Sequence, residues 1–209
     1  MNLLRAAATI SGLTLVSRIL GLVRETLVAS VYGAGALTDA FFVAFRLPNM
    51  LRRLFAEGAF TQAFVPVLAQ SQQHSPEETR RVLDAVATML FWVLTAVVAV
   101  GVLAAPWLVW MVASGLRQDP QTFSIAVLMT RWMFPYILLI SLVALAAAVL
   151  NLWKRFAVPA FAPVLLNISI ILAALFLSPY FDPPVLALAA GVMIGGVLQL
   201  LWQVPSLVR

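Results

Sequence analysis

Eight charged side chains lie within an otherwise apolar stretch that spans residues 17 to 58. They make up more than a third of the 21 formally charged side chains in the chain, 13 basic and 8 acidic. The eight are Arg18, Arg24, Glu25, Asp39, Arg46, Arg52, Arg53 and Glu57. A charge near the middle of a membrane helix costs roughly 2.5–3.5 kcal/mol on insertion scales, so such residues usually face a polar cavity, pair or bind a ligand. We expect two helices whose arginines line an aqueous, anion-binding cavity.

The spacing within the second of these helices predicts a polar stripe. Asp39, Arg46 and Arg53 are spaced by seven residues, which is two helical turns. Asn49 follows Arg46 by three residues, and Glu57 follows Arg53 by four. All five therefore fall on one face of a helix, whereas the opposite face carries phenylalanine and leucine side chains that suit lipid or neighbouring helices. One polar stripe on a spanning helix favours a cavity.

The excess of arginine over acid indicates the chemistry of the ligand. Arg18, Arg24, Arg46, Arg52 and Arg53 face only three acids in this stretch. Arginine offers a fork of donors that matches phosphate and carboxylate groups, and it stays charged. We therefore predict an anionic ligand, most naturally a phosphate or pyrophosphate group. The sequence contains no nucleotide-binding loop, metal-ligand cluster or nucleophile–base pair, so we expect no cofactor, no metal and no catalysis.

Some of these charges have alternative interpretations. Arg52 and Arg53 lie near the inner end of their helix, where they can extend to the lipid headgroups. Glu57 can simply pair with Arg53 one turn away. Asp39 can be an acidic residue that the helix dipole favours at the N-terminus. The two arginines of the first helix lie too deep for these explanations, so they are the strongest candidates for the cavity wall.

The composition places the chain in a membrane. Hydrophobic residues make up 63% of the 209 residues and charged residues only 10%, against about 25% in soluble domains. We expect six spanning helices, at about residues 6–31, 36–70, 85–116, 122–153, 158–177 and 185–208. A polar loop at residues 71–81 would carry His74 as a solvated histidine, and the first helix would be retained rather than cleaved as a signal peptide. Scattered basic residues at helix ends favour membrane lipids, not nucleic acid, as partners.

The basic residues are distributed unevenly between the two sets of connections. One set carries Arg5, Arg80, Arg81, Lys154, Arg155 and Arg209, and the other carries only Arg117. Short loops that are rich in lysine and arginine stay in the cytoplasm. We therefore predict that both termini are cytoplasmic.

Two sequence blocks carry a resemblance to a known family. SRILGLVRE at 17–25 and YGAGALTDAFFVAFRLPNMLRRLFAEGAFTQAFVPVLA at 32–69 resemble the N-terminal region of the MurJ (also called MviN) family. FPYILLISL, AAVLNLWKRFAVPAFAPVLLNIS and PPVLALAAGVMIGGVLQL resemble later parts of that region, in the same order. Members are bacterial inner-membrane flippases that move lipid II, the undecaprenyl-pyrophosphate-linked precursor of peptidoglycan, from the cytoplasmic to the periplasmic leaflet. The resemblance implies this function, substrate and location.

The resemblance also implies a fold and a set of site residues. The family has two lobes of six helices around a charged central cavity with alternating access, and this all-α chain looks like the first lobe. A second lobe, or a second copy, would be needed to complete the cavity. The cavity arginines of the family correspond to Arg18, Arg24, Arg52 and Arg53, and its acidic positions to Glu25, Asp39 and Glu57. The spacing of the polar residues along the second predicted helix adds Arg46 and Asn49 as cavity or gate residues.

Two alternative functions stay open. An exporter of drugs or of another polyprenyl-linked saccharide, from the same multidrug/oligosaccharidyl-lipid/polysaccharide exporter superfamily, would share the fold. Exporters of cationic drugs would need bare carboxylates rather than an excess of arginine. A six-helix membrane protein that binds lipid or acts as a scaffold, without transport, belongs to a different class.

Overall fold

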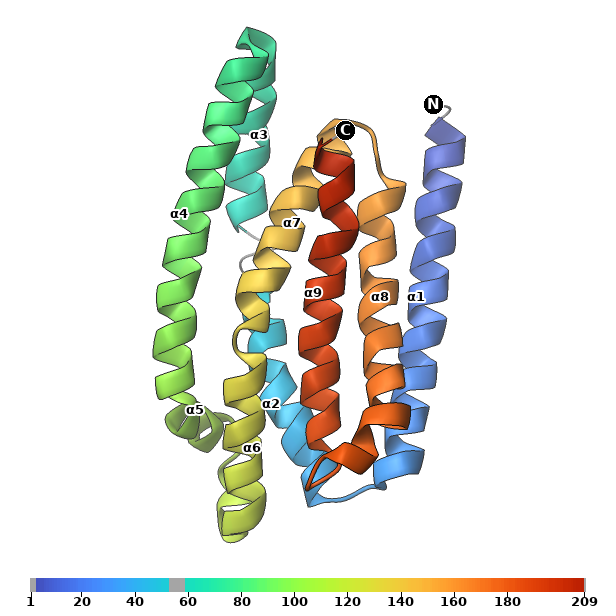
Figure 1. Ribbon diagram of the computed structural model, residues 1–209, viewed down its shortest axis with the longest axis vertical. Helices are drawn as coiled ribbons and strands as arrows, with labels where there is room; N and C mark the ends of the chain where they lie inside the picture. The colour runs from blue at the N-terminus through green and yellow to red at the C-terminus, as the bar shows by residue number, and fades with distance from the viewer. Residues whose placement is uncertain (1–2, 53–58, 209) are drawn as a thin grey trace.

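The chain folds into long helices that run along one common axis, and both termini lie at the same end (Figure 1). The computed structural model describes residues 3–52 and 59–208. In chain order the main helices are α1 (Leu3–Tyr32), α2 (Ala36–Arg52), α3 (Ala59–His74), α4 (Pro76–Leu103), α5 (Ala105–Val112), α6 (Pro120–Met133), α7 (Tyr136–Leu152), α8 (Ala157–Leu172) and α9 (Leu186–Val208). The all-helical prediction is confirmed for these residues.

Five helical segments within the described residues are long and apolar enough to cross a membrane. They are Ala7–Tyr32, Glu77–Leu103, Pro120–Leu152, Ala157–Tyr180 and Leu186–Leu207. The remaining predicted span, at residues 36–70, is occupied by α2 with 17 residues and α3 with 16. Each is shorter than the roughly 20 residues that a spanning helix needs. The structure therefore confirms a multi-pass membrane protein, and the sixth span stays a prediction.

The polar loop predicted at residues 71–81 is wrong. α3 continues to His74, and α4 begins two residues later at Pro76. The reason is a strong helix start, because the Ser75 hydroxyl accepts a hydrogen bond from the Glu78 backbone N–H at 3.1 Å. Proline at the first helical position and acidic residues in the first turn add to it. The polar residues here therefore cap the start of α4 in a short connection and do not form a long loop.

Two further predicted helices are divided by proline. The predicted helix at 85–116 ends at Leu103 and is followed by α5, which has Pro106 in its first turn and turns aside at the end of the bundle (Figure 1). The predicted helix at 122–153 is divided into α6 and α7 at Pro135. Proline lacks an N–H and its ring clashes with the preceding turn, so a helix kinks or restarts there.

α6 begins at a second side-chain cap, outside the membrane-spanning segments. The Asp119 carboxylate accepts hydrogen bonds from the Thr122 hydroxyl and from the Gln121 backbone N–H, the latter at 3.0 Å. These bonds, first that from Thr122, lower the pKa of Asp119 below its usual value despite some desolvation. The cap is therefore at full strength at neutral pH.

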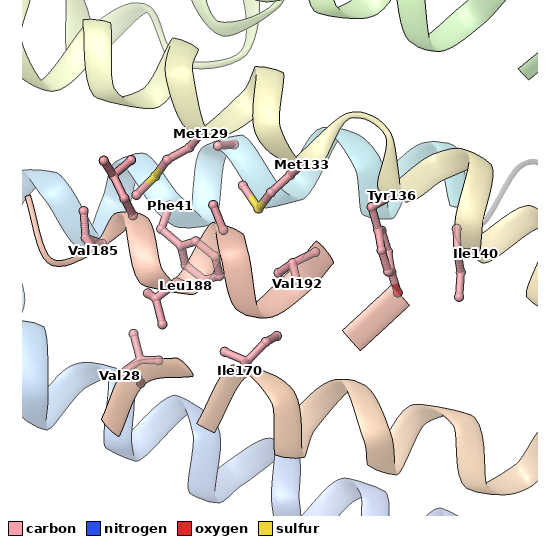
Figure 2. Packing of buried hydrophobic residues seen from close by; sticks show 14 of the residues in the cluster. Val28, Phe41, Met129, Met133, Tyr136, Ile140, Ile170, Val185, Leu188 and Val192 are labelled. Atoms are coloured by element: carbon pink, nitrogen blue, oxygen red, sulfur yellow. The ribbon is translucent and has the colours of Figure 1, made fainter. Parts of the chain in front are cut away.

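The main core surrounds α9. Figure 2 shows side chains of α2 and α6 on one side of α9 and side chains of α1 and α8 on the other. Its labelled members are Val28, Phe41, Met129, Met133, Tyr136, Ile140, Ile170, Val185, Leu188 and Val192. A Cβ added at Gly191 would lie 3.1 Å from the Ile170 Cα in α8 and 2.7 Å from the Cβ of Ala173, the residue directly after α8. Small residues thus let α8 and α9 approach closely, which is how helices gain packing energy in a bilayer.

α1 lies at the edge of the bundle, alongside α8 (Figure 1). Its outer side chains Leu15, Ile19 and Leu22 are 60%, 54% and 66% exposed. An apolar face of this kind needs lipid or another protein surface to cover it. The inner face of α1 is the one that contributes to the site.

Candidate anion-binding cavity

A cavity of about 600 Å³ lies among α1, α2, α7, α8 and α9. This volume is in the range of small-molecule sites, roughly 300–1,000 Å³. Its polar lining residues are Arg24, Asn49, Tyr136, Asn151, Asn167, Gln199 and Gln203. The other lining side chains are apolar, and many of them are alanines. Among the described residues, the wall thus combines one cation, Arg24, with several neutral hydrogen-bonding groups.

Arg24 is held in place by α8. Its Nη1 donates a hydrogen bond to Asn167 Oδ1 at 3.0 Å, and its Nη2 lies 3.2 Å from Glu25 Oε1. Asn167 Nδ2 in turn donates to the Ser17 carbonyl at 3.0 Å, with the Ser17 hydroxyl at 3.4 Å. The Arg24 side chain is 20% exposed, against 60% for Glu25. One carboxamide therefore joins two turns of α1 and fixes the guanidinium on the cavity wall.

The sequence of α1 explains why Asn167 can reach it. Ser17, Gly21, Arg24 and Val28 recur every three or four residues and so share one face of the helix. A Cβ added at Gly21 would meet Asn167 Nδ2 at 3.8 Å, and Val28 is only 1% exposed. The residues on this face bring α8 against α1, and Arg24 is the charged member of the contact.

The structure brings together only part of the predicted site. Asn49 is half-buried and lines the cavity with Arg24. Arg18, Asp39 and Arg46 are exposed, and none of them is among the described residues that line it. They face away from this cavity in the lobe as it stands.

The packing of α2 explains the split of the predicted polar stripe. α2 packs against α6 through one face, whose buried residues include Ala40, Phe41 and Ala44. Arg46 projects from the opposite face, whereas Asn49 lies about 60° around the helix from it. Asp39 lies in the first turn of α2, where the helix dipole favours an acid. The spacing of the polar residues predicts a polar side of the helix but not the edge that meets the cavity.

Three predicted site residues fall where the structure gives no side-chain information. Arg53 and Glu57 lie outside the described residues, and only the backbone of Arg52 is described. Their roles as cavity residues stay predictions.

Sequence reasoning missed the polar residues that α7, α8 and α9 contribute to the cavity, namely Tyr136, Asn151, Asn167, Gln199 and Gln203. A signal for them was present, because a polar side chain inside an apolar spanning segment marks a polar pathway or a helix contact. These side chains are neutral, so the pattern of charged residues in the sequence does not indicate them.

These features define a class: a multi-pass, all-helical membrane lobe with a cationic cavity between its helices. The model of the family described as lipid II flippase MurJ matches residues 28–209. The chain belongs to the MurJ family.

Similar proteins agree with this assignment. The chain is 56% identical over 208 residues to the lipid II flippase MurJ of Burkholderia cenocepacia, covering 99% of this chain and 40% of that protein. It is 42% identical to the probable lipid II flippase MurJ of Buchnera aphidicola subsp. Acyrthosiphon pisum, covering 41% of it. It also resembles a solved structure of lipid II flippase MurJ in an inward closed conformation, with a TM-score of 0.79, 30% identity and coverage of 94% of this chain and 41% of that one. The chain therefore spans about 40% of the length of the relatives it matches.

Proposed function

We propose that this chain is the N-terminal lobe of a lipid II flippase of the bacterial inner membrane. The observation that carries the proposal is the guanidinium of Arg24, which Asn167 holds on the wall of a 600 Å³ cavity. Membership of the MurJ family and the names of the relatives support the choice of substrate. The proposal therefore depends on the positive charge of Arg24, which lies on the wall of a cavity in a membrane-spanning lobe.

A pyrophosphate group suits this arrangement chemically. Arg24 offers a planar fork of donors, and hydrogen bonds to charged groups are each worth about 1.5–3 kcal/mol. Glu25 is well exposed, so it can move away from Arg24 when an anion arrives. The apolar walls lower the local dielectric and strengthen the attraction. Arg24 would hold the pyrophosphate while the lipid tail stays in the membrane.

Translocation needs a second wall. This lobe supplies one side of a cavity, and a second lobe or a second copy of the chain would supply the other. The greater length of the relatives supports a second lobe. Alternating access would then open the space between the two walls first to one leaflet and then to the other.

We also propose that both termini face the cytoplasm. Arg80, Arg81, Lys154 and Arg155 are exposed, and the helix ends that carry them lie at the same end of the bundle as the termini (Figure 1). These 209 residues contain no cysteine, so within them one introduced cysteine reports one position. Lys154→Cys should react with a membrane-impermeant maleimide only after permeabilisation, and Tyr180→Cys should react in intact spheroplasts. The reverse pattern would contradict this orientation.

The function is tested by translocation of fluorescent lipid II in proteoliposomes that contain the full-length gene product. Arg24→Gln should reduce the initial rate at least tenfold, since it removes the positive charge of Arg24 from the cavity wall. Arg81→Gln is the matched control, because Arg81 is exposed on α4 and does not line the described cavity. It should transport at the normal rate.

Three outcomes would count against the flippase proposal or against the role that it gives to Arg24. Equal rates for both variants would remove Arg24 from the mechanism. Export of cationic dyes in preference to lipid II would favour the drug exporter, and lipid binding without translocation would favour a binding or scaffold protein.

A further inference from the structure

Gln203 on α9 is a fully buried polar side chain that has no hydrogen-bond partner among the residues that the structure describes. Its exposure is 0%, and neither Nε2 nor Oε1 is bonded. One turn earlier, Gln199 is buried to a similar degree but satisfied, since its Nε2 donates to the Ala162 carbonyl at 2.8 Å and its Oε1 accepts from the Tyr136 hydroxyl at 3.4 Å. Gln199 therefore links α9 to α7 and α8, whereas the Gln203 amide forms no hydrogen bond with the described residues.

An unused buried carboxamide is unfavourable for the fold alone. Amide groups removed from water lose hydrogen bonds that nothing replaces, so leucine or methionine would serve better as simple packing. Gln203 lines the same cavity as Arg24, and the lining also includes small residues such as Ala147, Ala148 and Ala162. A group that enters the cavity can supply the missing partners.

The chemistry of the carboxamide limits what that group can be. Nε2 only donates and Oε1 only accepts. A phosphate offers acceptors alone and would leave Oε1 unpaired, and a metal cation or an ammonium would leave Nε2 unpaired. Hydroxyl and acetamido groups both donate and accept, so they can satisfy both atoms.

We propose that Gln203 recognises the uncharged saccharide part of the lipid-linked ligand, a sugar hydroxyl or acetamido group, while Arg24 holds the pyrophosphate. This inference rests on the proposed function. Gln203 lies near the C-terminal end of α9, nearer the end of the bundle that carries both termini (Figure 1), and Arg24 lies in the far half of α1. The cavity therefore has two different polar regions for two different parts of one ligand.

Binding of two probes to the full-length gene product tests the assignment. The probes are undecaprenyl pyrophosphate and the same lipid carrying its disaccharide and peptide. Gln203→Leu should bind the glycosylated lipid about tenfold more weakly, a change of about 1.4 kcal/mol. It should bind the bare pyrophosphate lipid as the wild type does, and its thermal midpoint should be unchanged or higher because an unpaired amide has been removed.

Two further variants protect the test. Gln203→Met keeps the length of the side chain and should give the same result if Gln203→Leu does not fold. Gln121→Leu makes the same chemical change at an exposed position on α6 outside the described cavity, and it should bind both probes normally.

The possible results separate the two claims. Unchanged binding of both probes by the Gln203 variants would overturn this inference and leave the proposed function standing. Equal weakening of both probes with a lower thermal midpoint would assign Gln203 a structural role and would also overturn it. Failure of the wild type to bind either probe would overturn the proposed function and this inference with it.

Discussion

Two substitutions of Asn167 distinguish its contribution to the stability of the α1–α8 contact from its effect on ligand binding by Arg24. Asn167→Leu removes the acceptor for Arg24 at 3.0 Å and the donor to the Ser17 carbonyl at 3.0 Å. A hydrogen bond to a charged group is worth about 1.5–3 kcal/mol and a neutral one about 1 kcal/mol. Because the Arg24 side chain is 20% exposed, water recovers part of the loss. We expect the free energy of unfolding to fall by about 2 kcal/mol, just below the roughly 2.5 kcal/mol at the low end of the sum.

Asn167→Asp should have the opposite balance of effects. The carboxylate keeps an acceptor for Arg24 and forms an ion pair, so the helix contact loses less stability than with leucine. The same ion pair cancels the positive charge that the ligand needs. Affinity for undecaprenyl pyrophosphate should therefore fall at least tenfold in Asn167→Asp, and by less in Asn167→Leu, where the guanidinium keeps its charge.

Two assays on the full-length gene product in detergent measure this crossed order. The melting temperature should be highest for the wild type, lower for Asn167→Asp and lowest for Asn167→Leu. The affinity for undecaprenyl pyrophosphate, measured by calorimetric titration, should be highest for the wild type, lower for Asn167→Leu and lowest for Asn167→Asp. The same order in both assays would mean that binding follows stability alone. Wild-type affinity in Asn167→Asp would refute the claim that the ligand meets the charge of Arg24.

Three smaller predictions test other parts of the structure. Glu25→Gln should raise pyrophosphate affinity up to about fivefold in calorimetry, since an exposed pair that competes for Arg24 is worth under about 1 kcal/mol; weaker binding would contradict this. Ser75→Ala should lower the free energy of unfolding by about 1 kcal/mol in denaturant titrations, and Ser75→Asn should restore it. Gly191→Ala should lower the free energy of unfolding by about 1–3 kcal/mol, because the added methyl group would clash with α8. Gly12→Ala has open space around it and should raise the free energy of unfolding by up to about 1 kcal/mol. Equal shifts in melting temperature for the two variants would refute the close approach of α8 and α9.

The sequence was sufficient to predict the membrane environment and the position of Arg24 on a cavity wall. Hydrophobicity reports which solvent a segment is compatible with, so the apolar segments predicted a helical membrane protein directly. The depth of Arg24 within an apolar helix predicted a polar cavity, because nothing local could neutralise it except Glu25. The apolar segments and the depth of Arg24 can both be read from the residues nearby in the sequence, without knowledge of distant contacts.

The rest depends on local backbone effects that hydropathy does not report, and on contacts between distant segments. Ser75 starts a helix through one hydrogen bond, and Pro135 divides another helix, although the hydropathy around each predicted a loop and a continuous span. Asn49 meets the cavity and Arg46 does not, because the packing of α2 on α6 decides which edge faces inward. Asn167 is 143 residues from Arg24 in the chain. Spacing within one helix cannot reveal such a partner.

The central claim is that the guanidinium of Arg24 binds the pyrophosphate of a lipid-linked ligand. The most direct test is calorimetric titration of undecaprenyl pyrophosphate into the full-length gene product, comparing wild type with Arg24→Gln at two salt concentrations. We predict at least tenfold weaker binding by Arg24→Gln and a smaller dependence on salt, since one charge contact is lost. Equal affinity and equal salt dependence in the two proteins would contradict the account.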